Sequence, residues 1–169
     1  LHSLMNILST HDTMRLMTAV AGKNMDGRSK KEMSECFICE SNQDDAKFKV
    51  KAASLLQYTL CGVPSLYYGD EAGMQGYRDP FNRRPYPWGK EDEDLREYFK
   101  NTLKIRNKAA FKKGKTEVIS AQNGVLIFRR YYKSSKVICI FNGHNNEKTV
   151  YINDKKIVIG AMSYKIIEE

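Results

Sequence analysis

The pattern of hydrophobic and polar positions divides the chain into two parts with different periodicities. In the first part, short apolar runs alternate with longer amphipathic stretches. Leu4–Leu8 and Val63–Tyr68 are mostly apolar and predict buried strands. Asp44–Leu60 and Asp94–Asn107 repeat apolar residues at a period near 3.6, which predicts amphipathic helices. We therefore expect the first part to be an α/β structure with parallel strands.

The predicted helices and loops can be specified further. Thr13–Ala21 begins a third helix, whereas Gly22–Ser41 is polar and predicts an exposed loop or short helix. The segment Gly69–Lys90 is a long loop rich in Gly and Pro, and loops of this length in compact domains are usually functional. The expected buried faces of the two long helices comprise Phe48, Ala52, Leu55, Leu56 and Thr59, and Leu95, Tyr98, Phe99, Thr102, Leu103 and Arg106.

From Lys115 onward the pattern changes to short alternating or β-branched runs separated by turn residues. Regular short strands of this kind predict a small antiparallel β-sandwich. The predicted domains are therefore residues 1–112, of α/β type, and residues 113–169, all-β. The expected strands are Glu117–Ala121, Gly124–Tyr131, Lys136–Phe141, Thr149–Ile152, Ile157–Ile159 and Ser163–Ile167.

Composition and charge exclude several classes of protein. Hydrophobic residues make up 41% and charged residues 28% of the 169 positions, which is typical of a globular protein, and no apolar run is long enough to span a membrane. The net charge of +8 is compatible with nucleic-acid binding. However, the lysines are scattered over predicted polar faces and turns, which favours a solvated surface. A basic nucleic-acid binder remains one alternative.

The four cysteines predict free thiols. Cys36 and Cys39 form one C-x-x-C pair without a second pair or spaced histidines, so a zinc site is not indicated. Cys61 and Cys139 lie in apolar runs and predict small buried side chains. Free thiols favour a reducing compartment such as the cytoplasm, although the localisation itself is not determined by the sequence.

Candidate chemistry gathers where the two predicted parallel strands end. His11 and Asp12 follow the first strand, and Asp70 and Glu71 follow the second. Carboxylates accept hydrogen bonds from vicinal hydroxyls and an imidazole can donate one, so this arrangement suits a hydroxyl-rich ligand. The simpler alternatives are that Asp12 caps the helix after Thr13 and that the second acidic pair lies in a solvated loop. Aromatic residues that offer sugar-binding faces, or pack in the core, are Tyr67, Tyr68, Tyr77, Phe81, Tyr86 and Trp88.

Three segments carry a family resemblance. NILSTHDTMR (Asn6–Arg15), GVPSLYYGDEAGM (Gly62–Met74) and DPFNRRPYPW (Asp79–Trp88) resemble, in order, three conserved segments of the α-amylase family of glycoside hydrolases. The similarity is greatest to the neopullulanase, cyclomaltodextrinase and maltogenic-amylase branch. Thr10 departs from the Ser that this branch places before the His. The resemblance implies the last two βα units of a (β/α)8 barrel followed by a β-sandwich.

The resemblance also implies a retaining enzyme that acts on α-1,4- or α-1,6-linked maltooligosaccharides, cyclodextrins or pullulan. By motif position, Asp12 matches the acid that stabilises the transition state without attacking the substrate. His11 matches a residue that binds the same sugar, and Asp79 and Arg83 match residues that hold the next glucose. No metal ligand and no cofactor is implied for this segment, although calcium occurs in full-length members.

Two carboxylates of such an enzyme are missing from the sequence. The nucleophile and the acid/base normally lie about 5 Å apart, and the G-x-R-x-D segment of the nucleophile does not occur here. A complete barrel takes about 250 residues. The first residue is Leu and the next ones already resemble core, so we expect a C-terminal part of a longer enzyme that is inactive alone. Its uncovered barrel strands are expected to form homo-oligomers.

Two further interpretations remain open. A non-enzymatic carbohydrate-binding sandwich requires aromatic platforms, for which Tyr131, Tyr132, Tyr151 and Tyr164 are candidates. An oligo-1,6-glucosidase-like or trehalose-processing relative usually carries Asn before the His-Asp pair, so Thr10 argues against it.

Overall fold

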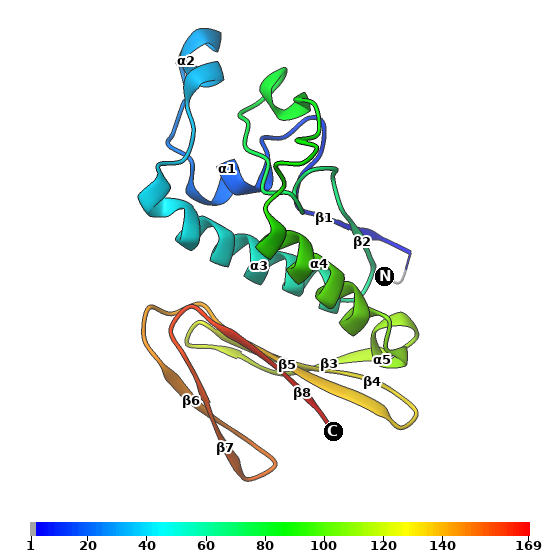
Figure 1. The fold of residues 1–169 in the computed structure, drawn as a ribbon. Coiled ribbons are helices and arrows are strands. Elements are labelled where there is room, and N and C mark those ends of the chain that lie inside the picture. Colours follow the sequence, from blue (N-terminus) through cyan, green and yellow to red (C-terminus); the bar gives the residue numbers. More distant parts are fainter. Residues whose placement is uncertain (1–2) are drawn as a thin grey trace. The chain divides into compact units, whose positions relative to one another are not determined.

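The computed structural model describes residues 3–169, which form two compact units (Figure 1). The first unit comprises the residues up to Tyr58 together with Gly62–Leu103, and the second comprises Thr59–Cys61 and Lys104–Glu169. The predicted domain limits, 1–112 and 113–169, stay a prediction.

The first unit contains a short parallel strand pair with helices. Its elements are β1 (Met5–Ile7), α1 (Leu16–Ala21), α2 (Lys30–Glu35), the 3-10 turn η1 (Glu40–Asn42), α3 (Gln43–Thr59), β2 (Val63–Ser65), the 3-10 turn η2 (Phe81–Arg83) and α4 (Glu93–Arg106). Strands β1 and β2 pair in parallel, with Asn6 opposite Pro64. The predicted parallel arrangement of these two segments is thus confirmed, although both strands are shorter than expected.

The prediction that these strands are buried is wrong. The side chains of Met5 and Ile7 are 59% and 50% exposed, and Val63 is 49% exposed. The reason is that β1 and β2 form a two-stranded sheet within residues 3–169, so their outer edges and much of one face are open to solvent. Apolar strands that are left uncovered favour association, and the expected homo-oligomer stays a prediction.

The helices of the first unit enclose its core. Leu16 and Met17 of α1 pack with Val50 of α3 and with Leu95 and Phe99 of α4. Helix α4 begins where the Asp92 carboxylate accepts a hydrogen bond from the Leu95 backbone N–H at 3.0 Å, which is an N-terminal cap.

The predicted faces of the long helices are only partly right. On α3, Leu55 is buried as expected. Gln57 was not expected on the buried face, yet only 4% of its surface is exposed, because its amide reaches the strand pair. It donates hydrogen bonds to the carbonyls of Asn6 (2.7 Å) and Ser65 (2.9 Å). On α4, Leu103 was expected inside but is 51% exposed. A pattern that counts only apolar residues cannot find the buried amide.

The second unit is an antiparallel β-sandwich preceded by the short helix α5 (Ala109–Lys112). One sheet has the strand order β3-β4-β5-β8, and the hairpin β6-β7 forms the other layer. The isoleucines Ile127, Ile138, Ile140, Ile152 and Ile159 fill the space between the layers. The predicted antiparallel β-structure of this part of the chain is confirmed. Its strands are β3 (Lys115–Gln122), β4 (Val125–Tyr132), β5 (Ser135–Asn142), β6 (Lys148–Ile152), β7 (Lys155–Ile159) and β8 (Tyr164–Glu168).

Two of the hairpin turns follow from residues that tolerate positive φ. Asn123 and Gly124 have φ values of 51° and 67°, and Asn153 and Asp154 have 49° and 62°. Two-residue turns with positive φ at both positions match the twist of antiparallel strands, and Asn-Gly is their usual sequence. These residues therefore set the β3-β4 and β6-β7 registers.

Candidate functional site

The predicted His-Asp pair lies in a tight turn after β1. The Thr10 backbone N–H donates to Thr13 Oγ1 at 2.8 Å, and the Asp12 backbone N–H donates to Thr10 Oγ1 at 3.1 Å. The two threonines thereby satisfy the backbone of the turn and leave the side chains of His11 and Asp12 outside, 62% and 73% exposed. His11 Nε2 lies 3.1 Å from Asp12 Oδ2.

Asp12 is not a helix cap. Helix α1 begins at Leu16, and its N-cap position is Arg15, three residues beyond Asp12. The carboxylate is instead directed toward the loop that contains Arg83, so the capping alternative is wrong.

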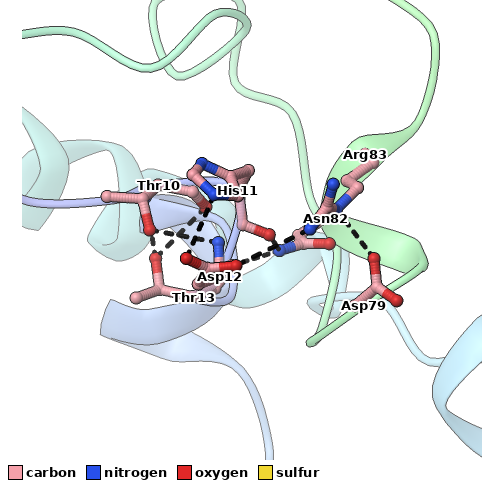
Figure 2. A network of polar contacts seen from close by, with 7 residues as sticks. All are labelled: Thr10, His11, Asp12, Thr13, Asp79, Asn82 and Arg83. Atoms are coloured by element: carbon pink, nitrogen blue, oxygen red, sulfur yellow. Dashed lines mark hydrogen bonds and ion pairs between the residues drawn. The ribbon is translucent and has the colours of Figure 1, made fainter.

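The loop around η2 brings the other two predicted residues to Asp12 (Figure 2). Arg83 Nε contacts Asp79 Oδ1 at 2.7 Å, and Arg83 Nη2 lies 3.6 Å from Asp12 Oδ1. All four side chains are about half exposed or more, at 47% to 73%. We call His11, Asp12, Asp79 and Arg83 the loop cluster. Exposed ion pairs of this kind contribute little to stability, so their charges and hydrogen-bonding groups are free to serve a ligand.

Asp70, the acid after β2, has a different environment from the one expected. It is 2% exposed, so the solvated-loop alternative is wrong for this residue. The Ser9 hydroxyl donates a hydrogen bond to its carboxylate. Burial raises the pKa of Asp70 to about 6, and the Ser9 hydrogen bond and the Arg15 charge lower it in part. Asp70 therefore anchors the residue before the turn and does not face solvent.

Arg15 anchors the other side of the turn. Its side chain is fully buried, and its guanidinium lies 4.3 Å from the ring centres of both Tyr67 and Tyr68. It also donates a hydrogen bond to the Tyr68 carbonyl. Cation–π contacts in a desolvated site are worth about 2 kcal/mol each. Two of the aromatic residues proposed as sugar platforms thus hold an arginine.

The remaining loop aromatics divide between core and surface. Tyr77 is buried, and its hydroxyl donates to the Lys23 carbonyl at 3.0 Å. In contrast, Trp88 is 81% exposed and its ring centre lies 4.6 Å from that of Tyr86. The sugar-platform interpretation is therefore compatible with Tyr86 and Trp88 but not with Tyr77.

Sequence reasoning missed Asn82. Its side chain is fully buried, and its Nδ2 donates hydrogen bonds to the carbonyls of His11 and Thr13, both at 2.7 Å (Figure 2). The available signal was its position between Asp79 and Arg83 in the DPFNRR segment. This position alone does not distinguish a buried supporting residue from an exposed loop residue.

Other predicted features have a simple structural outcome. The cysteines are free thiols; Cys139 is buried, which raises its pKa to about 12, whereas Cys61 is only half-buried. Of the four sandwich tyrosines, Tyr151 is 70% exposed and the other three are partly buried. Within residues 3–169 no cluster of three or more His, Cys, Asp or Glu side chains suits a metal ion. No helix in that range has the length and apolarity to cross a membrane.

Comparison with known proteins identifies relatives along nearly the whole chain. It is 34% identical, over 96% of its length, to an amylopullulanase from Thermoanaerobacter thermohydrosulfuricus, of which it covers 11%. It is 30% identical, over 88% of its length, to neopullulanase 2 from Thermoactinomyces vulgaris, of which it covers 22%. No family model matches the chain.

Solved structures agree with the sequence relatives. A maltogenic amylase from S. marinus matches 97% of the chain with a TM-score of 0.72 and 25% identity, and the chain covers 22% of that protein. A cyclic α-maltosyl-(1→6)-maltose hydrolase from Arthrobacter globiformis shares the fold, with a TM-score of 0.74 at 19% identity. The chain is therefore similar, along nearly its whole length, to a C-terminal part of enzymes of the α-amylase family of glycoside hydrolases. It spans about a tenth of the amylopullulanases that it matches.

Proposed function

We propose that the full-length protein containing this chain is a retaining α-glucan hydrolase. Its substrates are α-1,4- or α-1,6-linked maltooligosaccharides, cyclodextrins or pullulan. In this proposal residues 1–112 are the C-terminal part of the catalytic (β/α)8 barrel, with β1 and β2 as its last two strands, and residues 113–169 form the β-sandwich domain. The relatives named amylopullulanase and neopullulanase support the substrate class.

The observation that carries the proposal is the meeting of two loops at Asp12. Arg83 lies between two carboxylates, 2.7 Å from Asp79 and 3.6 Å from Asp12, and His11 stands on the other side of Asp12. Acceptors and donors thus alternate along an exposed edge, and a sugar presents vicinal hydroxyls that both donate and accept hydrogen bonds. The cluster follows the carboxyl end of β1, where barrel enzymes carry their active sites.

Each residue has a chemical role in this proposal. Asp12 accepts hydrogen bonds from the 2- and 3-hydroxyls of the sugar at the cleaved bond, and bonds to the 2-hydroxyl strengthen as the ring approaches an oxocarbenium-like transition state. His11 hydrogen-bonds the same ring. Asp79 and Arg83 hold the next glucose. The Arg83 guanidinium lies 3.6 Å from Asp12 Oδ1 and helps to hold this carboxylate beside the neighbouring sugar site.

The nucleophile and the acid/base are proposed to lie outside this chain. A retaining mechanism requires two carboxyl groups about 5–5.5 Å apart, one to attack the sugar and one to protonate the leaving oxygen. In the loop cluster both Asp12 and Asp79 contact Arg83, and in the roles proposed here both bind sugar hydroxyls, so neither is assigned to attack the sugar or to protonate the leaving oxygen. The isolated chain is therefore proposed to bind sugar at most and not to cleave it.

The test compares the full-length protein with the isolated chain on β-cyclodextrin, maltoheptaose and pullulan. We expect the full-length protein to hydrolyse at least one of them, with the α-configuration of the product retained in early proton NMR spectra. The isolated chain should release no reducing sugar. Inversion of configuration, or any measurable hydrolysis by the isolated chain, would contradict the proposal.

A further inference from the structure

Asn82 is a buried amide between the two loops of the cluster. Its Nδ2 donates to the carbonyls of His11 and Thr13, the residues on either side of Asp12, at 2.7 Å each. Two carbonyl acceptors require the donor end of the amide at this position. The side chain is fully buried, so both hydrogen bonds are shielded from water. Asn82 thus holds the backbone on both sides of the Asp12 carboxylate.

The other hydrogen bonds of the turn act on its internal shape and on its two ends. The bonds between Thr10 and Thr13 set the local shape of the turn. Ser9 and Arg15 attach its two ends to the segment that follows β2, through Asp70 and the Tyr68 carbonyl. Asn82 is the direct hydrogen-bonded link from the turn to the η2 segment that also carries Arg83.

The η2 segment packs closely against the backbone of Gly76. A Cβ at this glycine would lie 2.1 Å from the Phe81 carbonyl oxygen, so the absence of a side chain lets the two backbones approach. The Gly76 carbonyl also accepts a hydrogen bond from the Arg15 backbone N–H at 2.9 Å. Asn82 therefore lies on a closely packed segment. If the turn moved, this segment could not readily move with it.

We propose that Asn82 is a positioning residue for Asp12. It sets the register between the carboxylate that meets the reacting sugar and the Asp79–Arg83 pair that holds the next one, so it acts on catalysis through Asp12 and touches no substrate. This inference rests on the proposed function of the loop cluster. Functional groups must be held within about 0.5 Å of the productive geometry, and a displacement of about 1 Å can cost about 100-fold in rate.

A double-mutant cycle in the full-length protein tests the role. We expect Asn82→Ala to lower kcat about 100-fold with a smaller change in KM, since the displaced Asp12 fails mainly in the transition state. In an Asp12→Asn background the same change should lower kcat by less than about 3-fold, because residues that act as a unit are not additive. If Asn82→Ala does not fold, Asn82→Ser replaces it in the same cycle.

Asn82→Asp provides a second measurement, the pH dependence of kcat. A purely structural role of Asn82 would not change this pH dependence. An ionised carboxylate repels the two carbonyls, whereas a protonated one can donate to one of them. The ratio of variant to parent kcat should therefore rise as the pH falls, at a temperature where circular dichroism shows both proteins folded. Asn107→Asp, at an exposed position, is the matched control and should give a flat ratio.

The possible failures are distinguishable. Full additivity of Asn82→Ala and Asp12→Asn, or an unchanged kcat in a folded Asn82→Ala protein, overturns the positioning role and leaves the proposed function standing. An unchanged kcat in Asp12→Asn overturns the proposed function, and the role of Asn82 with it.

Discussion

Replacing Asp12 with asparagine in the full-length protein should lower kcat by about 100- to 1,000-fold and change KM by less than about 5-fold. In the proposed role, the hydrogen bonds of this carboxylate to the sugar strengthen in the transition state and contribute several kcal/mol there, of which a neutral amide would keep only part. The change should leave stability nearly untouched, because Asp12 is 73% exposed and surface substitutions usually cost less than about 0.5 kcal/mol. Steady-state kinetics on maltoheptaose measures both parameters.

The matched control is Asp26→Asn, an exposed aspartate outside the loop cluster, which should leave kcat unchanged. An Asp12→Asn protein with parental kcat would mean that this carboxylate does not act in the chemical step. A rise in KM alone would assign Asp12 to uniform substrate binding.

The second large effect concerns stability and Asp70. Its pKa is raised by burial to about 6, against 3.8 for an unperturbed carboxyl. Between these values the unfolded chain releases a proton that the folded protein keeps, so the free energy of unfolding falls as the pH rises through this window. The loss amounts to about 3 kcal/mol, and it is complete above about pH 6. Below about pH 4 Asp70 is protonated in both the folded and the unfolded chain, so its burial no longer lowers the free energy of unfolding.

Asp70→Asn removes this titration. We expect the variant to be more stable than the parent at about pH 7, by up to about 3 kcal/mol, and the difference to disappear toward about pH 4. Urea titrations of the chain at several pH values measure it, with Asp26→Asn as the control. A variant that is less stable at neutral pH would show that ionised Asp70 is compensated by Arg15 and Ser9.

Much of the fold follows from local patterns. The sandwich was predictable because its strands alternate and Asn-Gly or Asn-Asp turns separate them. Helix α3 was predictable from its period, although not in its contacts, because Gln57 is polar and its partners lie 51 and 8 residues away. The exposure of β1 and β2 could not be deduced from their composition, since an apolar strand is buried only if other elements cover it.

The site was predictable in its members but not in its support. Family motifs identified His11, Asp12, Asp79 and Arg83, and the structure brings the four side chains together. The supporting residues are Asn82, Arg15 and Asp70, which are buried polar groups. Their hydrogen bonds and ring contacts join segments that are more than 50 residues apart, and no spacing rule in a single sequence reveals such contacts.

The most direct test of the account is a crystal structure of the full-length protein with a bound maltooligosaccharide. We predict that the Asp12 carboxylate oxygens lie about 2.5–3.0 Å from the 2- and 3-hydroxyls of one glucose, as hydrogen bonds require, and that Asp79 and Arg83 contact the neighbouring glucose. A sugar chain that occupies the active site without contacting Asp12, or Asp12 directed at the anomeric carbon as a nucleophile, would contradict the account.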